Sequence, residues 1–189
     1  MKRAALFILI MPVIGCSLQK ASYINDIKDE ESFVYSLPYE KGKSHMLAQG
    51  YLSTLSHKGE VALDFKMRKG TKVCAARDGV VVAIKDDSKK GGYNWKYINT
   101  GNHIIVKHED GTYGNYWHLE CKGVLVHVGD SVLQGQVIGL SGNTGYSAFP
   151  HLHFEVTSQY TVGTNQLPTK FRTKKGVRFL KPLHRYRAM

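Results

Sequence analysis

The chain has 189 residues, 42% of them hydrophobic, and a mean hydropathy of -0.28. This is enough apolar material for one folded domain with short appendages, and it excludes disorder throughout and a polytopic membrane protein. The net charge of +11 lies mostly at the two ends, because residues 16–155 carry 16 Lys/Arg against 15 Asp/Glu. The Lys and Arg residues also lie in no motif typical of a nucleic-acid-binding domain, so we expect no nucleic-acid partner.

Residues 1–15 are typical of an export signal. Two cations near the start precede an apolar run, Ala4 to Ile14, which is shorter than the about 20 residues needed to cross a bilayer. The run ends in Val13-Ile14-Gly15-Cys16, which resembles the bacterial lipoprotein box. On that resemblance Cys16 carries lipid, and the protein is exported and anchored to the membrane of the cell envelope, expected to be the outer membrane facing the periplasm. The alternative is a plain signal peptide cleaved nearby.

A polar tether is expected over 16–36, where four acidic residues cluster. The two remaining cysteines, Cys74 and Cys121, form no CxxC pattern. An exported protein can oxidise such a pair, but the sequence does not show whether the two Cα atoms approach each other. A disulfide and two free thiols therefore both stay open.

Short β-strands with turns between them are predicted from residue 37 to 160. Eleven Tyr, seven Phe and nineteen Gly favour strands and tight turns. In chain order, the pattern predicts a hairpin across Asp78-Gly79, a second hairpin across Asp110-Gly111, and strands at Val124–Val128, Val137–Leu140 and His151–Val156. We expect a compact all-β domain, mostly antiparallel and of sandwich or barrel type, followed by a basic C-terminal extension over 161–189.

Alternation along the last predicted strand places His151, His153 and Glu155 on one face, opposite the apolar residues between them. Two imidazoles about 7 Å apart can serve one metal ion, or one can bind metal while the other acts on substrate. Such a pair also occurs as a purely structural feature. Glu155 either orients a metal ligand or is solvated at the rim of the site. We predict the solvated position at the rim.

Two upstream segments could complete a site. His57 and Asp64 flank a short stretch and could join a late histidine in a set of two imidazoles and one carboxylate, which suits zinc and leaves a fourth position open. The alternatives are a surface histidine and a turn-capping aspartate. His118 follows two aromatic residues and, taken alone, is more typical of a packed histidine.

Together and in this order, the motifs closely resemble the lysostaphin/LytM-like zinc endopeptidases. The resemblance covers about residues 45–157, including Gly129 to Val132, Gly135 to Gly139, Ser141 to Gly145 and Pro150 to Glu155. It implies a groove across an antiparallel sheet, one zinc ion per chain held by His57, Asp64 and His153, and two catalytic histidines, His118 and His151. Six residues separate His57 from Asp64 where familiar members have three, which we interpret as a wider loop. The remaining histidines are expected to be structural: His45, His103, His108, His127 and His184.

The implied function is hydrolysis of peptide bonds in peptidoglycan cross-links, with stem peptides as substrate. A water activated by zinc would attack, and one of the two catalytic histidines would carry its proton. The alternatives are an inactive family member that binds cell wall or activates another wall hydrolase, and a basic module that binds an anionic polymer. Loss of ligands is the usual mark of the inactive class, and here all five positions are filled. The protein is expected to be a monomer.

Overall fold

The computed structural model describes residues 34–53, 56–161 and 163–189. The described residues all belong to one compact unit. The expected signal peptide, Cys16 and nearly all of the tether lie outside the described residues. Within the described part of the chain, no helix combines the length and apolar character needed to cross a membrane.

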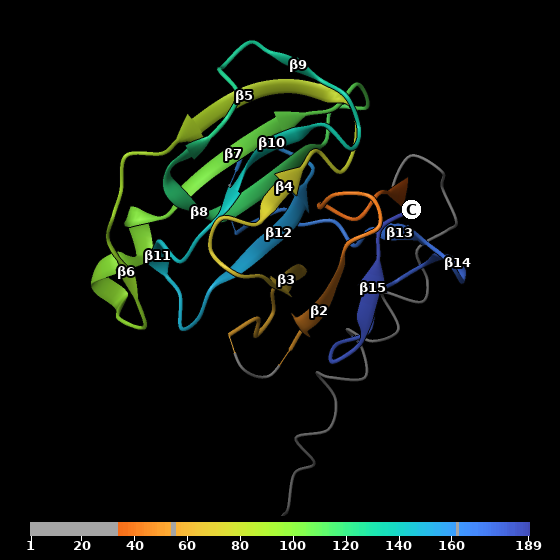
Figure 1. Cartoon of the computed structure of the whole chain (residues 1–189), viewed down its shortest axis with the longest axis horizontal. Helices are drawn as coiled ribbons and strands as arrows, with labels where there is room; N and C mark the ends of the chain where they lie inside the picture. Colours follow the sequence, from red (N-terminus) through yellow and green to blue (C-terminus); the bar gives the residue numbers. More distant parts are fainter. Residues whose placement is uncertain (1–33, 54–55, 162) are drawn as a thin grey trace, which may run out of the picture. The chain divides into compact units, whose positions relative to one another are not determined.

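One large sheet organises the domain (Figure 1). Its strands follow one another in the order β15-β2-β3-β12-β8-β7-β5-β9, and β10 joins β8 and β4 off this path. The pairs between these strands are antiparallel, as the sequence predicts. Their bounds are β2 (Ser44–Gln49), β3 (Ala62–Lys66), β4 (Lys72–Cys74), β5 (Gly79–Lys85), β7 (Asn102–Lys107), β8 (Tyr113–Val124), β9 (Ser131–Val132), β10 (Val137–Ser141), β12 (His151–Thr157) and β15 (Arg185–Arg187).

Two small sheets complete the fold. One contains β1 (Val34–Tyr35), β13 (Lys170–Thr173) and β14 (Gly176–Arg178), and the other pairs β6 (Gly91–Gly92) with β11 (Gly145–Tyr146). A 3-10 helix, η2 (Trp95–Thr100), lies beside β6 and β11 (Figure 1). It is the sole helix among the described residues, so the all-β prediction is confirmed.

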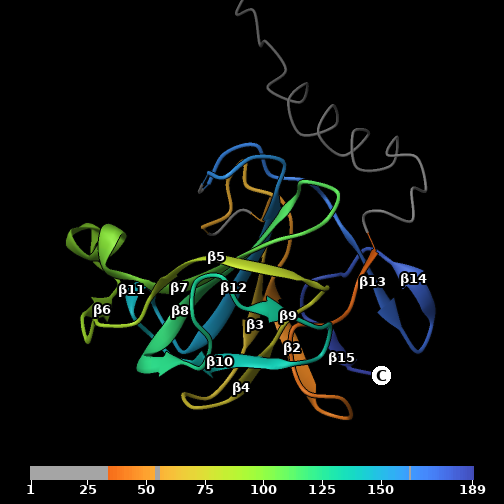
Figure 2. The ribbon, with the colours of Figure 1, turned by 90° about the horizontal axis from the view of Figure 1, so that it is seen from above.

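The large sheet folds over the core because the long strand β8 pairs with strands on both sides of that core. The first part of β8 pairs with β7 and β12, and its last part pairs with β10. Figures 1 and 2 together show β4 and β10 on one side of β8 and β12. Large, fully buried side chains fill the interior: Tyr35, Tyr39, Tyr116, Phe65, Phe154, Phe171, Leu47, Leu63, Ile104, Leu119, Ile138 and Leu152.

Alternation along β3 and β12 separates core residues from site residues. Leu63 and Phe65 are at most 1% exposed, so Asp64 between them points to the opposite face. Leu152 and Phe154 anchor β12 in the same way. Burial of one such side chain stabilises the fold by roughly 1.5–3 kcal/mol. A one-residue slip would expose all of them, so packing fixes the register that aligns the site.

The predicted hairpin across Asp78-Gly79 is wrong. β4 pairs with β10, whereas β5 pairs with β7 and β9. A Cβ atom at Gly79 would lie 2.4 Å from the backbone oxygen of Lys107. The glycine therefore permits a close approach of β5 to β7 rather than a turn back onto β4. The hairpin across Asp110-Gly111 and the strand at 151–156 are confirmed as β7–β8 and β12, whereas the strand predicted at Val124–Val128 exists only as the end of β8.

The two downstream cysteines do not form a disulfide. Cys74 lies buried on β4 and Cys121 is half-buried on β8, and both thiols are free. Burial raises the pKa of the Cys74 thiol to about 11, so it stays protonated at neutral pH.

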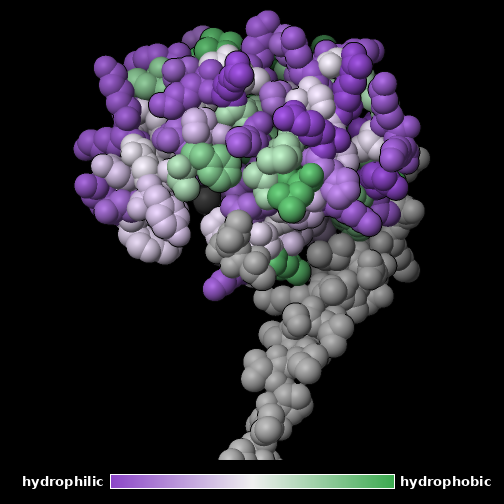
Figure 3. All heavy atoms as spheres, turned by 60° about the horizontal axis from the view of Figure 1, so that its bottom comes forward, coloured by the Kyte–Doolittle hydropathy of each residue, from purple (hydrophilic) through white to green (hydrophobic). Residues whose placement is uncertain are grey.

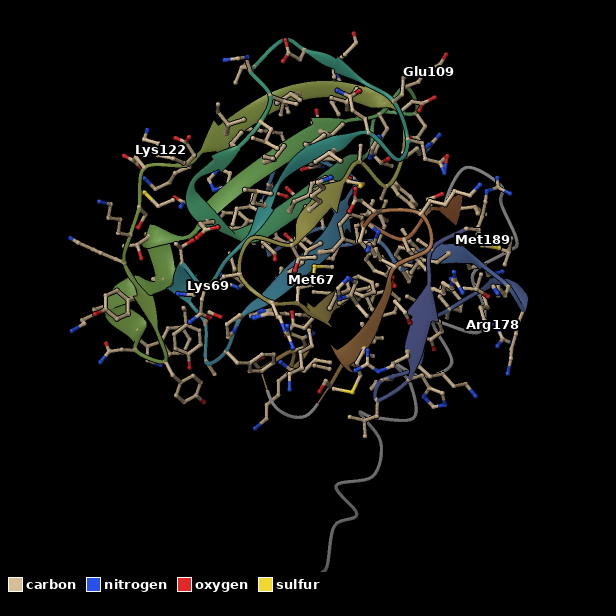
Figure 4. The ribbon with its side chains drawn as sticks, viewed as in Figure 1. Met67, Lys69, Glu109, Lys122, Arg178 and Met189 are labelled. Carbon is tan, nitrogen blue, oxygen red and sulfur yellow. The ribbon has the colours of Figure 1, made fainter. Side chains whose placement is uncertain are left out.

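Residues beyond 160 contribute strands to the domain. β13 pairs with β1, and its Phe171 is fully buried in the main core. β15 pairs with β2 and extends the large sheet. The outer side is cationic, since Lys174, Lys175 and Arg178 are exposed. Figure 4 labels Arg178 at the margin of the domain beside β14. The segment predicted as a basic extension thus has a packed inner side and a charged outer side.

Candidate metal and catalytic site

A row of side chains crosses the sheet on the face opposite the core. Residues directly opposite each other in antiparallel strands share a face, and the register pairs Asp64 with Gln49 on one side and His153 on the other. The row continues from His153 to Trp117 and from Trp117 to His103. Five neighbouring strands therefore present these side chains next to one another.

Two of the predicted ligands, His57 and His153, lie close to the carboxylate of the third, Asp64. Its Oδ2 atom is 3.2 Å from Nε2 of His57, and its Oδ1 atom is 3.0 Å from Nδ1 of His153. One donor atom from each of the three side chains lies within 4.8 Å of the other two. His57 and Asp64 are each only 2% exposed. The three side chains are thus close enough to hold one metal ion.

A second group shares one member with the first. His118, His151 and His153 also offer donor atoms within 4.8 Å of one another. Nε2 of His151 lies 3.4 Å from Oδ1 of Asp64, so all five predicted site residues lie in one cluster. The group that contains Asp64 suits a divalent cation better, because it supplies an anionic ligand beside two imidazoles.

A turn at Gly59 accommodates the wide spacing between His57 and Asp64. Gly59 has φ of +84°, a conformation that favours glycine, and the Glu60 amide donates to the His57 carbonyl at 3.1 Å. Nδ1 of His57 donates to the Gly50 carbonyl at 3.2 Å, which leaves Nε2 facing Asp64. The six intervening residues therefore return the chain to β3 without moving His57 out of the cluster.

The surroundings of Asp64 keep it ionised. Burial alone would raise the pKa of this carboxyl, but hydrogen bonds with His151, His153 and His57 hold the pKa well below its usual value. The side-chain amide of Gln49 donates to Oδ2 at 2.7 Å and fixes the plane of the carboxylate. Sequence reasoning missed Gln49, because its partner lies 15 residues away and no local motif marks it.

Both predicted catalytic histidines direct Nε2 into the cluster. Nδ1 of His118 donates to the Thr144 carbonyl at 2.7 Å, and Nδ1 of His151 donates to the Phe149 carbonyl at 2.8 Å. A carbonyl only accepts, so each ring donates a proton from Nδ1 and turns Nε2 toward the cluster. Burial, together with the charges of His151 and His153, lowers the pKa of His118 to about 3, so His118 is neutral near pH 7.

A bulge in β8 aims His118 at the cluster. Trp117 pairs with His103 and Leu119 pairs with Asn102, so His118 is an extra residue with no partner on β7. Its φ of +64° lies in the left-handed region, which is sparsely populated by residues other than glycine. Bulges redirect side chains beside active sites. This local strain is a feature that the sequence alone does not show.

The prediction that Glu155 is a solvated rim residue is wrong. Glu155 is 2% exposed, accepts hydrogen bonds from the Gly163 amide and the Gln166 side chain, and lies 4.0 Å from Nε2 of His153. Burial alone would lower the pKa of His153, but the hydrogen bond with Asp64 and the nearby Glu155 carboxylate raise it to about 10. The Glu155 carboxylate thus faces the ring nitrogen of His153 that points away from Asp64.

Substituting Glu155 by glutamine should weaken metal binding. The change keeps the shape of the side chain but removes the charge that orients His153, and outer partners of this kind are worth 10–100-fold in metal affinity. Competition with a fluorescent zinc chelator would measure the affinity, with the exposed Glu109 at the β7–β8 turn, labelled in Figure 4, changed to glutamine as the control. Equal affinities in the two variants would contradict this role for Glu155.

The remaining histidines lie outside the cluster, although one of them, His103, lines the same cavity. His45 faces the Lys66 carbonyl, His127 is exposed, and His108 is buried with Nδ1 bonded to the Asp78 carbonyl. His103 instead continues the row of site residues, with its ring centroid 4.2 Å from that of Trp117. His103 therefore lines the same cavity as the cluster, whereas His108 does not.

The cluster forms one wall of a cavity of about 520 Å³. Asp64, His118, His151 and His153 face it from the sheet, His57 faces it from the loop between β2 and β3, and the segments around β6, η2 and β11 close the other side. Figure 3 shows the hollow on this face of the molecule, beside a pale lobe at the left of the view. We call these five clustered side chains the metal-type cluster. A substrate in the cavity would therefore lie against it.

The pattern of Peptidase family M23 matches residues 56–166 of the chain, which contain all five predicted site residues. The chain belongs to peptidase family M23. This confirms the resemblance to lysostaphin-like enzymes that the motifs predict.

Several proteins similar to this chain are named as endopeptidases. The chain is 38% identical over 110 residues to glycyl-glycine endopeptidase ALE-1 from Staphylococcus capitis, covering 58% of this chain and 28% of that protein. It is 41% identical over 93 residues to peptidoglycan DD-endopeptidase ShyA from Vibrio cholerae, covering 49% and 19%. Lysostaphin from Staphylococcus simulans has a similar structure, with 32% identity, a TM-score of 0.51, and coverage of 65% of this chain and 46% of that chain. The chain spans only 19% to 28% of the length of these curated relatives.

Proposed function

We propose that the M23 domain is a zinc metallo-endopeptidase that hydrolyses peptide bonds in the cross-links of bacterial peptidoglycan. The observation that carries this proposal is the buried cluster of two imidazoles and one carboxylate, flanked in one cavity by two more histidines whose Nδ1 atoms donate to backbone carbonyls and whose Nε2 atoms face the cluster. Membership of family M23 and similarity to proteins named as peptidoglycan endopeptidases support the substrate class.

The donor set fits zinc. His57, Asp64 and His153 offer two nitrogens and one oxygen, and three protein ligands leave a fourth position for water or substrate. Each ligand is held by a partner outside the set: the Gly50 carbonyl for His57, Gln49 for Asp64, and Glu155 for His153. Zinc bound here supplies Lewis-acid activation of a water and of the scissile carbonyl at neutral pH.

The two other histidines supply proton transfer. His118 and His151 both direct Nε2 into the cavity, so either ring in its neutral form can take a proton from the attacking water and return it to the leaving amine. Their Nδ1–H bonds to backbone carbonyls fix the ring orientation throughout the reaction. Asp64 stays ionised, and the nearly complete burial of its carboxylate keeps competing water away from it.

Zinc content and hydrolysis of purified cross-linked muropeptides test this function together. We expect about one zinc ion per chain and release of monomers from dimers, with loss of both after chelation and recovery after zinc is added back. Zinc binding without cleavage of any cross-linked fragment would favour the alternative, a relative that binds wall or activates another hydrolase. The size of the leaving group among the products would separate endopeptidase from carboxypeptidase activity.

We also propose that the chain is exported and anchored to the cell envelope through lipid on Cys16, on the side of the outer membrane that faces the periplasm. The lipoprotein-box sequence at 13–16 supports the anchor. Export agrees with a substrate that lies outside the cytoplasm. Cys16→Ala should remove incorporation of labelled palmitate and release the protein into the soluble envelope fraction. Continued labelling of this variant would contradict the anchor.

A further inference from the structure

Two exposed aromatic rings stack on the half-buried Tyr146 ring beside the cavity. The Tyr146 ring lies 4.8 Å from the Trp95 ring at 14°, and 5.1 Å from the Tyr93 ring at 27°. Trp95 is 71% exposed and Tyr93 is 74% exposed. Near-parallel rings this close form a flat stack whose surface stays in water. We call Tyr93, Trp95 and Tyr146 the aromatic stack.

The backbone that carries the stack is tightly fixed. β6 and β11 pair in parallel, with Gly91 opposite Gly145 and Gly92 opposite Tyr146. A Cβ atom at Gly91 would lie 2.0 Å from the Asn143 backbone oxygen, so only glycine allows the two strands to approach this closely. The Asn94 side chain caps η2 by accepting from the Lys96 amide. The backbone that carries the rings is therefore fixed before any ligand arrives.

The stack does not stabilise the core, because its outer rings bury little apolar area. All three rings line the cavity that holds the metal-type cluster, together with Ile98 and Asn99. Exposed apolar patches beside a polar site mark ligand contacts more often than packing faces. The rings are therefore placed to contact a part of the substrate that extends away from the reacting bond.

We propose that the aromatic stack binds an amino-sugar ring of the glycan strand to which the substrate peptide is attached. The inference rests on the proposed function, since it assigns a second contact to the same substrate. A pyranose ring presents a flat face of C–H groups, which matches the electron-rich face of a ring stack. Asn99 offers an amide at the same wall for hydroxyl or acetamide groups. The sugar is covalently linked to the stem peptide, so a peptide in the cavity brings its glycan within reach.

A matched pair of substrates tests the proposal. One is a cross-linked muropeptide dimer that retains its disaccharides, and the other is the same cross-linked peptide after enzymatic removal of the sugars. The zinc-loaded protein should cleave the glycan-bearing dimer with the higher kcat/KM. Trp95→Ala should reduce that preference about tenfold, the size of one lost stacking contact, and Trp95→Phe should restore part of it. Tyr160→Ala, an exposed ring that packs on Tyr113 outside the cavity, is the control and should leave the preference unchanged.

A binding measurement separates this inference from the catalytic one. Tetra-N-acetylchitotetraose, which contains amino sugars and no peptide, should quench tryptophan fluorescence at millimolar concentration, and Trp95→Ala should remove the response. An unchanged melting temperature for Trp95→Ala would exclude a structural role. Two results would overturn the inference: an equal loss of kcat/KM on both substrates in Trp95→Ala, or no response to the saccharide. If neither substrate is cleaved but the saccharide still binds at Trp95, the proposed function fails and the sugar contact stands.

Discussion

Replacing Asp64 by alanine is expected to abolish metal binding and hydrolysis together. Asp64 is the one carboxylate in the described cluster that contacts three histidines, and an open water position cannot replace a ligand in a three-residue site. The core behind it is untouched, because Leu63 and Phe65 point to the opposite face. The domain should therefore stay folded, although with lower stability.

Metal content by mass spectrometry and cleavage of muropeptide dimers would be measured on the same Asp64→Ala preparation, with circular dichroism as the check on folding. Asp64→Asn tests the charge separately, because the amide keeps the shape of the side chain. His57→Ala and His153→Ala should give the same joint loss. If His57→Ala kept full zinc while His151→Ala lost it, the ligand set would be the group of three histidines instead.

Removing a histidine that carries protons should separate the two properties: the zinc content stays full while turnover falls. His151→Ala and His118→Asn should retain about one zinc ion per chain while kcat falls about 100-fold or more, as expected for loss of an acid–base group. Asparagine suits position 118 because it tolerates the left-handed backbone at φ of +64° better than alanine does.

His127→Ala is the matched control for these two variants, because its side chain is 89% exposed and lies outside the cavity. It should leave both zinc content and kcat unchanged. A loss of zinc in His118→Asn or His151→Ala would show that the residue is a ligand and would contradict its proposed role. Full activity in either variant would exclude that residue from the reaction.

Sequence patterns located the centre of the site because its geometry follows from strand alternation. Leu152 and Phe154 determine which way His153 points, and the same rule applied to β3 places Asp64 on that face. The sequence alone leaves His57 as either a ligand or a surface residue, and the family resemblance assigns it as a ligand, since a wide loop hides its relation to Asp64. The loop closes through the positive φ of Gly59, which no periodicity reveals.

The parts that the sequence did not predict depend on long-range contacts. The Asp78-Gly79 dipeptide favours a local turn, but β4 finds its partner more than 60 residues later, at Val137. Glu155 is polar in sequence, yet Gly163 and Gln166 from the following loop cover it. The row from Gln49 to His103 exists only once five strands are in register. Such features require the assembled sheet.

The two ends of the large sheet have a consequence for how the domain behaves at high concentration. A long uncovered edge strand offers free backbone groups to other chains and promotes aggregation. β15 covers the six-residue β2, is itself only three residues long, and places Arg185 and Arg187 on the outside. At the opposite end, β9 is two residues long. A chain cut before Arg185 would leave β2 as the edge, so its first defect should be self-association through Ser44–Gln49 rather than loss of chemistry.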